Sequence, residues 1–247
     1  MQRLALTTTL TAALASLTAC AIPEKHLTAA LADPFGCLGA ALPSTASNPV
    51  TIAGTLSDPF NGHPVAGAAV EGFIVGTPNA IFATTSDANG EFSRDQGFGG
   101  LPRSVYLRAS PNGYPASYFY PAVPVVDDVS VEIEMFTAMD LATIAKAAGA
   151  GTLDPTRTNL LVSVIDCNGA AVAGATVSTN PPGTVRYFVE EAPSPTAVAT
   201  DARTGSALVA NVPVSNTTVS ATVDGRTLRS HTLDGVAGAL MQIEIQP

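Results

Sequence analysis

The stretches "PVAGAAVEG" at Pro64–Gly72 and "AVAGATVST" at Ala171–Thr179 share one pattern of valine, glycine and alanine residues. Further pairs of similar segments follow them in the same order and at similar spacing. These pairs are "TTSDANGEF" with "ATDARTGSAL", "SVYLRASPNGY" with "TVSATVDGRTL", and "VSVEIEMF" with "LMQIEIQP". A series of matched blocks in one order predicts two copies of a single fold, at residues 50–136 and 158–247.

The last block of each copy alternates apolar and polar side chains. In "VSVEIEMF" the side chains of Val129, Val131 and Ile133 fall on one face of an extended chain, whereas Glu132 and Glu134 fall on the other. This period of two predicts a strand with one buried face. The segment "LMQIEI" in the second copy alternates in the same way.

Turn signals separate the short apolar runs. The segment Asp87–Gly90 reads "DANG", in which asparagine and glycine tolerate the positive φ that a tight turn needs. Gly67 and Gly174 mark places where a strand bends or packs too closely for a side chain. Short strands joined by frequent turns predict an all-β chain folded as antiparallel β-sandwiches.

The combined motif "G-x-x-x-D … G … PVAGA-x-V … T-x-D-A-x-G-x-F … V-x-L-x-A" resembles the carboxypeptidase regulatory-like domain, a transthyretin-like sandwich. The motif falls on Gly54, Asp58, 64–70, 85–92 and 105–109 in the first copy, and on Asp166, Gly169, 172–177, 200–205 and 219–221 in the second. The second copy departs from it where Arg203 and Thr204 lengthen a turn. The resemblance implies two Ig-like or transthyretin-like sandwich domains, and it implies little about a ligand.

A helical signal lies between the two copies, in "TAMDLATIAKAAGAG". Thr137 followed three residues later by Asp140 is typical of a capping box, and Gly149 and Gly151 are suited to end a helix. We expect residues 137–157 to form a short helical linker packed against the sandwiches.

The N-terminal segment has the features of an export signal. Arg3 is the only charged residue before Glu24, and a short uncharged run ends in "LTAC" at Leu17–Cys20. This ending resembles the lipobox of bacterial lipoproteins, which implies a signal peptide at 1–19, a lipid on Cys20 and a tether at 20–49. The alternative is an ordinary secretory signal with a chance cysteine. By the same resemblance Ala21, which is not an aspartate, favours the outer membrane.

Two further cysteines, Cys37 in "FGCLG" and Cys167 in "IDCNG", each lie within two residues of a glycine. An even pair in an exported chain suggests a disulfide, because the compartment is oxidising. Two separate free thiols are the alternative, since the sequence does not show whether the two Cα atoms approach.

The composition limits the classes of partner. The formal net charge is −9 with 11 lysine and arginine residues, and no cluster of basic residues occurs. Nucleic-acid binding is therefore not expected, because contacts to phosphates need clustered bases. The chain is 46% hydrophobic and 13% charged, which is unlike a disordered protein.

The sequence offers no set of residues typical of catalysis. His26, His63 and His231 form no metal-ligand pair, and no nucleophile elbow, Walker motif or dinucleotide motif is present. We therefore predict a protein that is not an enzyme and holds no cofactor or metal. Asp87, Asn89 and Glu91 in the turn could supply oxygens to calcium, as could Asp127 and Asp128, which precede an acidic strand. The alternative is that "DANG" is a hairpin turn and that Glu132 and Glu134 lie on the solvent-exposed face of a strand.

The aromatic cluster in "GYPASYFYP" is the best candidate for binding. Tyr114, Tyr118 and Tyr120 lie close together in a chain with few aromatic residues. Exposed rings stack on sugars and anchor partner proteins. The alternative is that these rings pack in the core or cover the joint between the domains.

Taken together, these features predict a membrane-anchored envelope lipoprotein that binds glycans or proteins without catalysis. Two alternatives remain at this stage, a purely structural envelope or adhesion component and a small hydrolase or accessory subunit of an enzyme. A binding module predicts exposed tyrosines in the aromatic cluster, whereas a structural component predicts buried ones.

Overall fold

The computed structural model describes residues 33–247, and residues 31–247 form one compact unit. The predicted signal peptide at 1–19, the predicted lipid site at Cys20 and the first part of the tether lie outside the described residues. Within the described range, no helix is both long enough and apolar enough to cross a membrane.

The first half of the chain forms two sheets that face each other. In one sheet β1 pairs with β2 and β5 in antiparallel fashion and with β8 in parallel, and the other sheet runs β4–β3–β6–β7 with antiparallel neighbours. The strands are β1 (Val50–Asp58), β2 (His63–Pro64), β3 (Ala69–Ile74), β4 (Ala80–Thr85), β5 (Glu91–Gln96), β6 (Val105–Ser110), β7 (Ser117–Tyr120) and β8 (Val129–Glu134).

The second half repeats this pairing. Strand β9 pairs with β13 in antiparallel fashion and with β17 in parallel, as β1 does with β5 and β8, and β14 pairs with β10 and β16 as β6 does with β3 and β7. The strands are β9 (Thr158–Val164), β10 (Thr176–Asn180), β11 (Thr184–Val189), β12 (Ala192–Ser194), β13 (Ser206–Val212), β14 (Asn216–Val223), β15 (Arg226–Thr227), β16 (His231–Asp234) and β17 (Leu240–Ile245).

Matched residues of the two halves make matched hydrogen bonds. The hydroxyl of Ser86 donates to the carbonyl of Val65 at 2.7 Å, and the hydroxyl of Thr200 donates to the carbonyl of Val172 at 2.6 Å. All four residues fall in blocks that the sequence analysis paired. A buried hydroxyl needs such a partner, which explains why both copies keep a serine or threonine before the turn aspartate.

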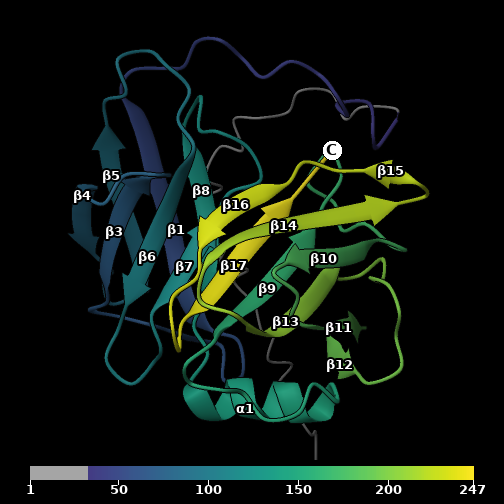
Figure 1. Cartoon of the computed structure of the whole chain (residues 1–247). Helices are drawn as coiled ribbons and strands as arrows, with labels where there is room; N and C mark the ends of the chain where they lie inside the picture. The colour runs from purple at the N-terminus through teal and green to yellow at the C-terminus, as the bar shows by residue number, and fades with distance from the viewer. Residues whose placement is uncertain (1–32) are drawn as a thin grey trace, which may run out of the picture. The chain divides into compact units, whose positions relative to one another are not determined.

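The two halves share a sheet, which the sequence analysis did not predict. Strand β17 pairs in parallel with β7, so that one nine-stranded sheet runs β12–β11–β13–β9–β17–β7–β6–β3–β4 across both halves (Figure 1). The predicted division into two sandwiches joined only by a helical linker is therefore not confirmed. The sandwiches are also not purely antiparallel, because β1–β8, β9–β17 and β7–β17 are parallel pairs.

The shared sheet buries opposite faces in its two parts. Phe119 of β7 packs into the core of the first half, whereas its neighbour Tyr120 packs into the core of the second half. Successive side chains of a strand point to opposite faces, so each core uses a different face of this sheet. The outer face of β9, β13 and β17 therefore lies on the same side of the sheet as the first core.

Helix α1 (Ala138–Ala147) covers part of that outer face (Figure 1). The predicted capping box is confirmed, because the Thr137 hydroxyl accepts the backbone N–H of Asp140 and the Asp140 carboxylate accepts the backbone N–H of Thr137. Leu141 and Ile144 of the helix pack in a small apolar cluster with Leu208.

Candidate binding groove

A groove lies on the part of the outer face that the helix leaves open. Its main pocket has a volume of about 530 Å³ and is bounded by α1, by β8 and the β1–β2 turn, and by the β11–β12 hairpin. The lining residues are Pro59, Phe60, Glu134, Phe136, Leu141, Ile144, Leu161, Phe188, Glu191, Ala192, Pro193, Thr204, Ser206, Leu208 and Leu240.

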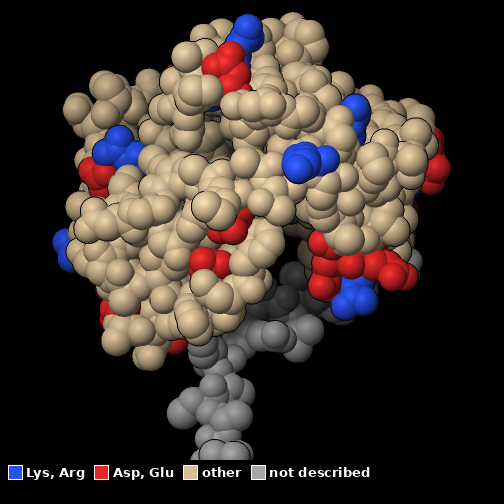
Figure 2. Space-filling model, turned by 90° about the horizontal axis from the view of Figure 1, so that it is seen from below, with Lys and Arg blue, Asp and Glu red and all other residues tan. Residues whose placement is uncertain are grey.

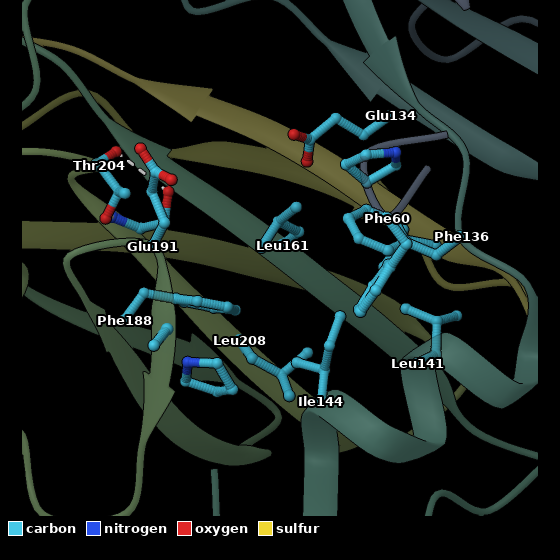
Figure 3. A pocket seen from close by; sticks show the side chains of 15 residues that line it. Phe60, Glu134, Phe136, Leu141, Ile144, Leu161, Phe188, Glu191, Thr204 and Leu208 are labelled. Carbon is cyan, nitrogen blue, oxygen red and sulfur yellow. Dashed lines mark hydrogen bonds between the residues drawn. The ribbon is translucent and has the colours of Figure 1, made fainter. Parts of the chain in front are cut away.

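The walls of the main pocket are mostly apolar. Figure 3 shows Leu141 and Ile144 pointing up from the helix. Leu161 lies between Phe136 on one side of the pocket and Glu191 on the other. Phe60 contacts Phe136 edge to face with ring centroids 6.3 Å apart, yet 57% of Phe60 is exposed. A large exposed ring beside an apolar pocket is a surface suited to a ligand.

A second pocket of about 290 Å³ adjoins the first and is acidic. It shares Glu134, Leu161, Thr204 and Ser206 with the main pocket. It is also lined by Phe119, Glu132, Ser163, Gln242, Ile243 and Glu244. The two pockets thus form one groove with an apolar end and an acidic end.

The alternation of β8 places its carboxylates in the groove. Val131 and Ile133 are buried in the first core, as the sequence predicted, so Glu132 and Glu134 point away from that core. The sequence analysis predicted that these two glutamates lie on the solvent-exposed face of the strand. The structure instead brings them against the outer face of the second half.

Gln242 fixes the distance between β8 and β17. Its amide oxygen accepts the backbone N–H of Glu134 at 3.1 Å, and its amide nitrogen donates to the backbone carbonyl of Glu134 at 2.6 Å. This side chain is 6% exposed, so both bonds are made away from water. The pair of bonds holds the acidic wall of the groove in place.

Two carboxylates of the groove are in unfavourable surroundings. Burial raises the pKa of Glu134, and the nearby charge of Glu132 raises it further. Burial also raises the pKa of Glu244, although the backbone N–H of Ala122 opposes the shift. No lysine or arginine within residues 33–247 forms an ion pair with these three glutamates.

The surface around the groove is acidic as well. Figure 2 shows aspartate and glutamate side chains on both sides of a hollow in the lower face. Figure 3 shows Glu191 on the opposite side of the pocket from Glu134. The Glu191 carboxylate pairs with Arg203 at 2.8 Å. Glu132, Glu134 and Glu244 form no such ion pair within residues 33–247, so their wall of the groove attracts cationic groups.

The structure places Tyr120 in the core and not on an exposed surface, which differs from the predicted exposed ring. Tyr120 is only 4% exposed and stacks on Tyr106 with ring centroids 5.1 Å apart. Burial raises the pKa of the Tyr120 hydroxyl well above its usual range. The ring belongs to the second core because β7 lies in the shared sheet.

The other two predicted binding residues are half-buried. Tyr118 packs against the second core, and its ring lies 6.1 Å from that of Tyr106. Tyr114 packs against the first core, and its hydroxyl donates to the Asp58 carboxylate at 3.1 Å. The alternative in which these rings pack in the core and at the joint thus describes their positions, and none of them lines the groove.

The remaining candidate residues have structural positions. The Sγ atoms of Cys37 and Cys167 lie 2.02 Å apart and join the tether to the second half as a disulfide. The Asp87 carboxylate accepts the backbone N–H groups of Asn89 and Glu91, as a turn aspartate does. Within the described range no group of three or more histidine, cysteine, aspartate or glutamate side chains could hold a metal ion.

His231 is the one histidine in a buried setting among residues 33–247. Its Nε2 atom is buried without a hydrogen-bond partner, and burial lowers the pKa of the imidazole. The ring lines a separate pocket of about 470 Å³ on the other side of the joint, beside Tyr120 and Arg229. The hydroxyl side chains of Ser104, Ser230 and Thr232 also line this pocket.

The sequence analysis missed the groove, although one signal was present. The run Ala207–Ala210 reads "ALVA" and is buried throughout, with Leu208 on the outer face and Val209 in the second core. A strand that is apolar on both faces is covered on both sides. This run predicts that something packs on the outer face, but not what it is.

A comparison with protein-family models finds no match, and a comparison with curated protein sequences finds none either. Distant similarity exists to solved structures. A candidate carbohydrate-binding protein from Bacteroides uniformis is 12% identical over 77% of this chain and 98% of that protein, with a TM-score of 0.30. The major pilin subunit of Bacillus cereus is 11% identical over 79% of this chain and 99% of that subunit, with a TM-score of 0.29.

A 9R-lipoxygenase from Cyanothece is 15% identical over 38% of this chain, with a TM-score of 0.25, and the match spans only 19% of the lipoxygenase. All three similarities are too distant to carry an argument about function.

Proposed function

We propose that this protein is a non-catalytic lipoprotein of the bacterial cell envelope that binds a glycan or protein ligand in the groove. The observation that carries the proposal is the apolar pocket of about 530 Å³ with the exposed ring of Phe60 at its mouth. Ligand sites are typically concave, mostly apolar and of roughly 300–1,000 Å³. The groove has these properties.

The N-terminal resemblance supplies the location in this proposal. A lipid on Cys20 would hold the protein at the outer membrane, and the tether would join the lipid to the sandwiches. The disulfide between Cys37 and Cys167 suits an oxidising compartment outside the cytoplasm. Cys20→Ser is expected to release the protein from the membrane fraction or to block its processing. A fully processed Cys20→Ser protein that stays with membranes would contradict the anchor.

The binding proposal is tested with the full-length protein in detergent, presented to a glycan array and to a phage library of random peptides. We expect ligands that Phe60→Ala loses and Leu101→Ala keeps. Leu101 is the matched control, because it is an exposed apolar residue at 49% exposure and does not line the groove. Absence of any binding that depends on Phe60 in both screens would overturn the binding function.

A purely structural envelope component is the second candidate, and one observation favours it. Tyr120 is buried and Tyr118 is half-buried at the joint, as expected for a scaffold. For this candidate the groove would have no ligand. The same two screens separate the candidates, because only the binding function predicts retention that depends on Phe60.

A further inference from the structure

We propose that the ligand of the groove is a peptide segment of a partner protein, with apolar side chains next to lysine or arginine. This inference rests on the proposed function, since it names the ligand class of the same groove. It follows from the chemistry of the two ends of the groove and from the residues that line both ends.

The apolar end is suited to leucine- or phenylalanine-sized side chains. Phe60, Phe136, Leu141, Ile144 and Leu208 surround it, and they come from the β1–β2 turn, the end of β8, the helix and β13. Removal of the exposed surface of Phe60 from water would favour a ligand that covers it. Aromatic anchors in apolar pockets are typical centres of protein interfaces.

The acidic end is suited to one or more cationic side chains. Glu132, Glu134 and Glu244 line it, and none of them has a cationic partner within residues 33–247. Figure 2 shows further aspartate and glutamate side chains on both sides of the hollow, with lysine or arginine beside one of these acidic groups. A carboxylate that is partly removed from water gains most from a ligand that brings the opposite charge.

The two ends are continuous, so one short segment can occupy both. Glu134 and Leu161 line both pockets, which places a carboxylate at the border of the apolar end. Ser163, Thr204 and Ser206 also line the acidic end. The Thr204 hydroxyl donates to Asp201 and the Ser206 hydroxyl donates to the Thr204 carbonyl, so both oxygens can still accept a backbone N–H of a peptide. An apolar residue and a basic residue close together in sequence would therefore reach both ends.

A glycan fits the groove less well. Sugars need several polar groups that converge on their hydroxyls, together with an exposed ring face for stacking. Phe60 supplies an exposed ring, but most of the main pocket is lined by aliphatic side chains and phenylalanine, and few polar groups line it. Anionic lipids and acidic polymers would be repelled by the carboxylates.

The test is a selection of random peptides displayed on phage against the full-length protein in detergent. Glu134→Gln and Phe60→Ala proteins serve for counter-selection, and Asp224→Asn and Leu101→Ala are their matched controls. Asp224 is exposed in the turn between β14 and β15, and β14 packs across the second core, on the opposite face of β13 from the groove. The retained peptides are sequenced, and the affinities of synthetic copies are measured at low and high salt.

We expect the retained peptides to carry lysine or arginine within a few positions of a large apolar residue. Their affinity should fall about tenfold in Glu134→Gln and in Phe60→Ala, a loss of about 1.4 kcal/mol, and should stay unchanged in both controls. Neutral or acidic retained peptides, or binding that Glu134→Gln leaves intact, would overturn the inference. Glycans that bind only when Phe60 is present, without such peptides, would overturn it and leave the proposed function standing.

Discussion

The two sides of the joint between the halves make opposite use of aromatic residues. On one side, Tyr106 and Tyr120 stack on each other beneath the second core. On the other side, Phe60 leaves more than half of its surface exposed at the mouth of the groove. The side that is rich in aromatic residues in the sequence buries most of the surface of its rings, and we call it the closed side. The side that has only scattered phenylalanines leaves the Phe60 ring exposed, and we call it the open side.

The difference arises from the shared sheet. Because β17 pairs with β7, the second half covers the face of β7 that carries Tyr118 and Tyr120. The same pairing leaves the outer face of β9, β13 and β17 beside β8, where no strand covers it. Local density of tyrosine therefore does not identify a binding site unless it is known which element packs on the strand.

The largest contrast is expected between Tyr120→Ala and Phe60→Ala. Removal of the buried Tyr120 ring should lower the free energy of unfolding by about 3–5 kcal/mol, as for other large core side chains. Removal of the exposed Phe60 ring should change it by no more than about 0.5 kcal/mol. Urea unfolding measures both values. Equal effects of the two substitutions would break the distinction between a closed and an open side.

The next effect concerns the link that holds the acidic wall. Gln242→Ala should lower the free energy of unfolding by about 1–3 kcal/mol, because the backbone N–H and carbonyl of Glu134 lose their partners. Gln96→Ala is the control, since Gln96 makes one exposed bond to Gly97. Chemical unfolding of both variants is the measurement, and equal values would show that Gln242 does not hold β8.

A smaller effect is expected for the tyrosine at the edge of the closed side. Tyr114→Phe removes only the hydroxyl that donates to Asp58, so the free energy of unfolding should fall by about 0.5–1.5 kcal/mol. Tyr106→Phe is the control, because the Tyr106 hydroxyl has no hydrogen-bond partner within residues 33–247. A Tyr114→Phe protein as stable as the control would indicate that the bond contributes nothing.

The smallest effect concerns the pH dependence of stability at Glu134. Burial raises the pKa of this carboxyl in the folded state, so the folded protein holds the proton more tightly than the unfolded chain does. Stability is therefore lost as the pH rises from the ordinary glutamate pKa to the raised one, and the loss is complete above that range. Glu134→Gln removes the loss and should raise the melting temperature at neutral pH only.

Glu91→Gln provides the control for that measurement, and thermal unfolding at neutral and at acidic pH provides the comparison. A Glu134→Gln protein that is less stable than the parent at neutral pH would show that the carboxylate is stabilised by a partner. The same ionisation should govern peptide binding, which is expected to weaken as the pH falls through the raised pKa.

Much of the local structure was predictable from the sequence. The alternation in "VSVEIEMF" identified the buried face of β8, and Thr137 with Asp140 identified the start of the helix. These features depend on neighbours in the chain, which a short pattern can show. Cys37 and Cys167 were predictable only as a possible pair, because two cysteines in an exported chain favour a disulfide in an oxidising compartment.

The joint and the groove were not predictable in the same way. The pairing of β17 with β7 joins residues more than a hundred positions apart, and no local pattern specifies it. Glu132 and Glu134 have the spacing of a solvent-exposed face, and only the fold brings them beside Leu161 and Glu244. A site built from several distant elements leaves no motif in the sequence.

The most direct test of the open and closed sides is hydroxyl-radical footprinting of the full-length protein, read by mass spectrometry. Phe60 at 57% exposure should be modified rapidly and Tyr120 at 4% exposure should be protected. Peptides that bind the groove should protect Phe60 and leave the rate at Leu101 unchanged. Rapid modification of Tyr120, or a Phe60 rate that bound peptide does not change, would contradict the account.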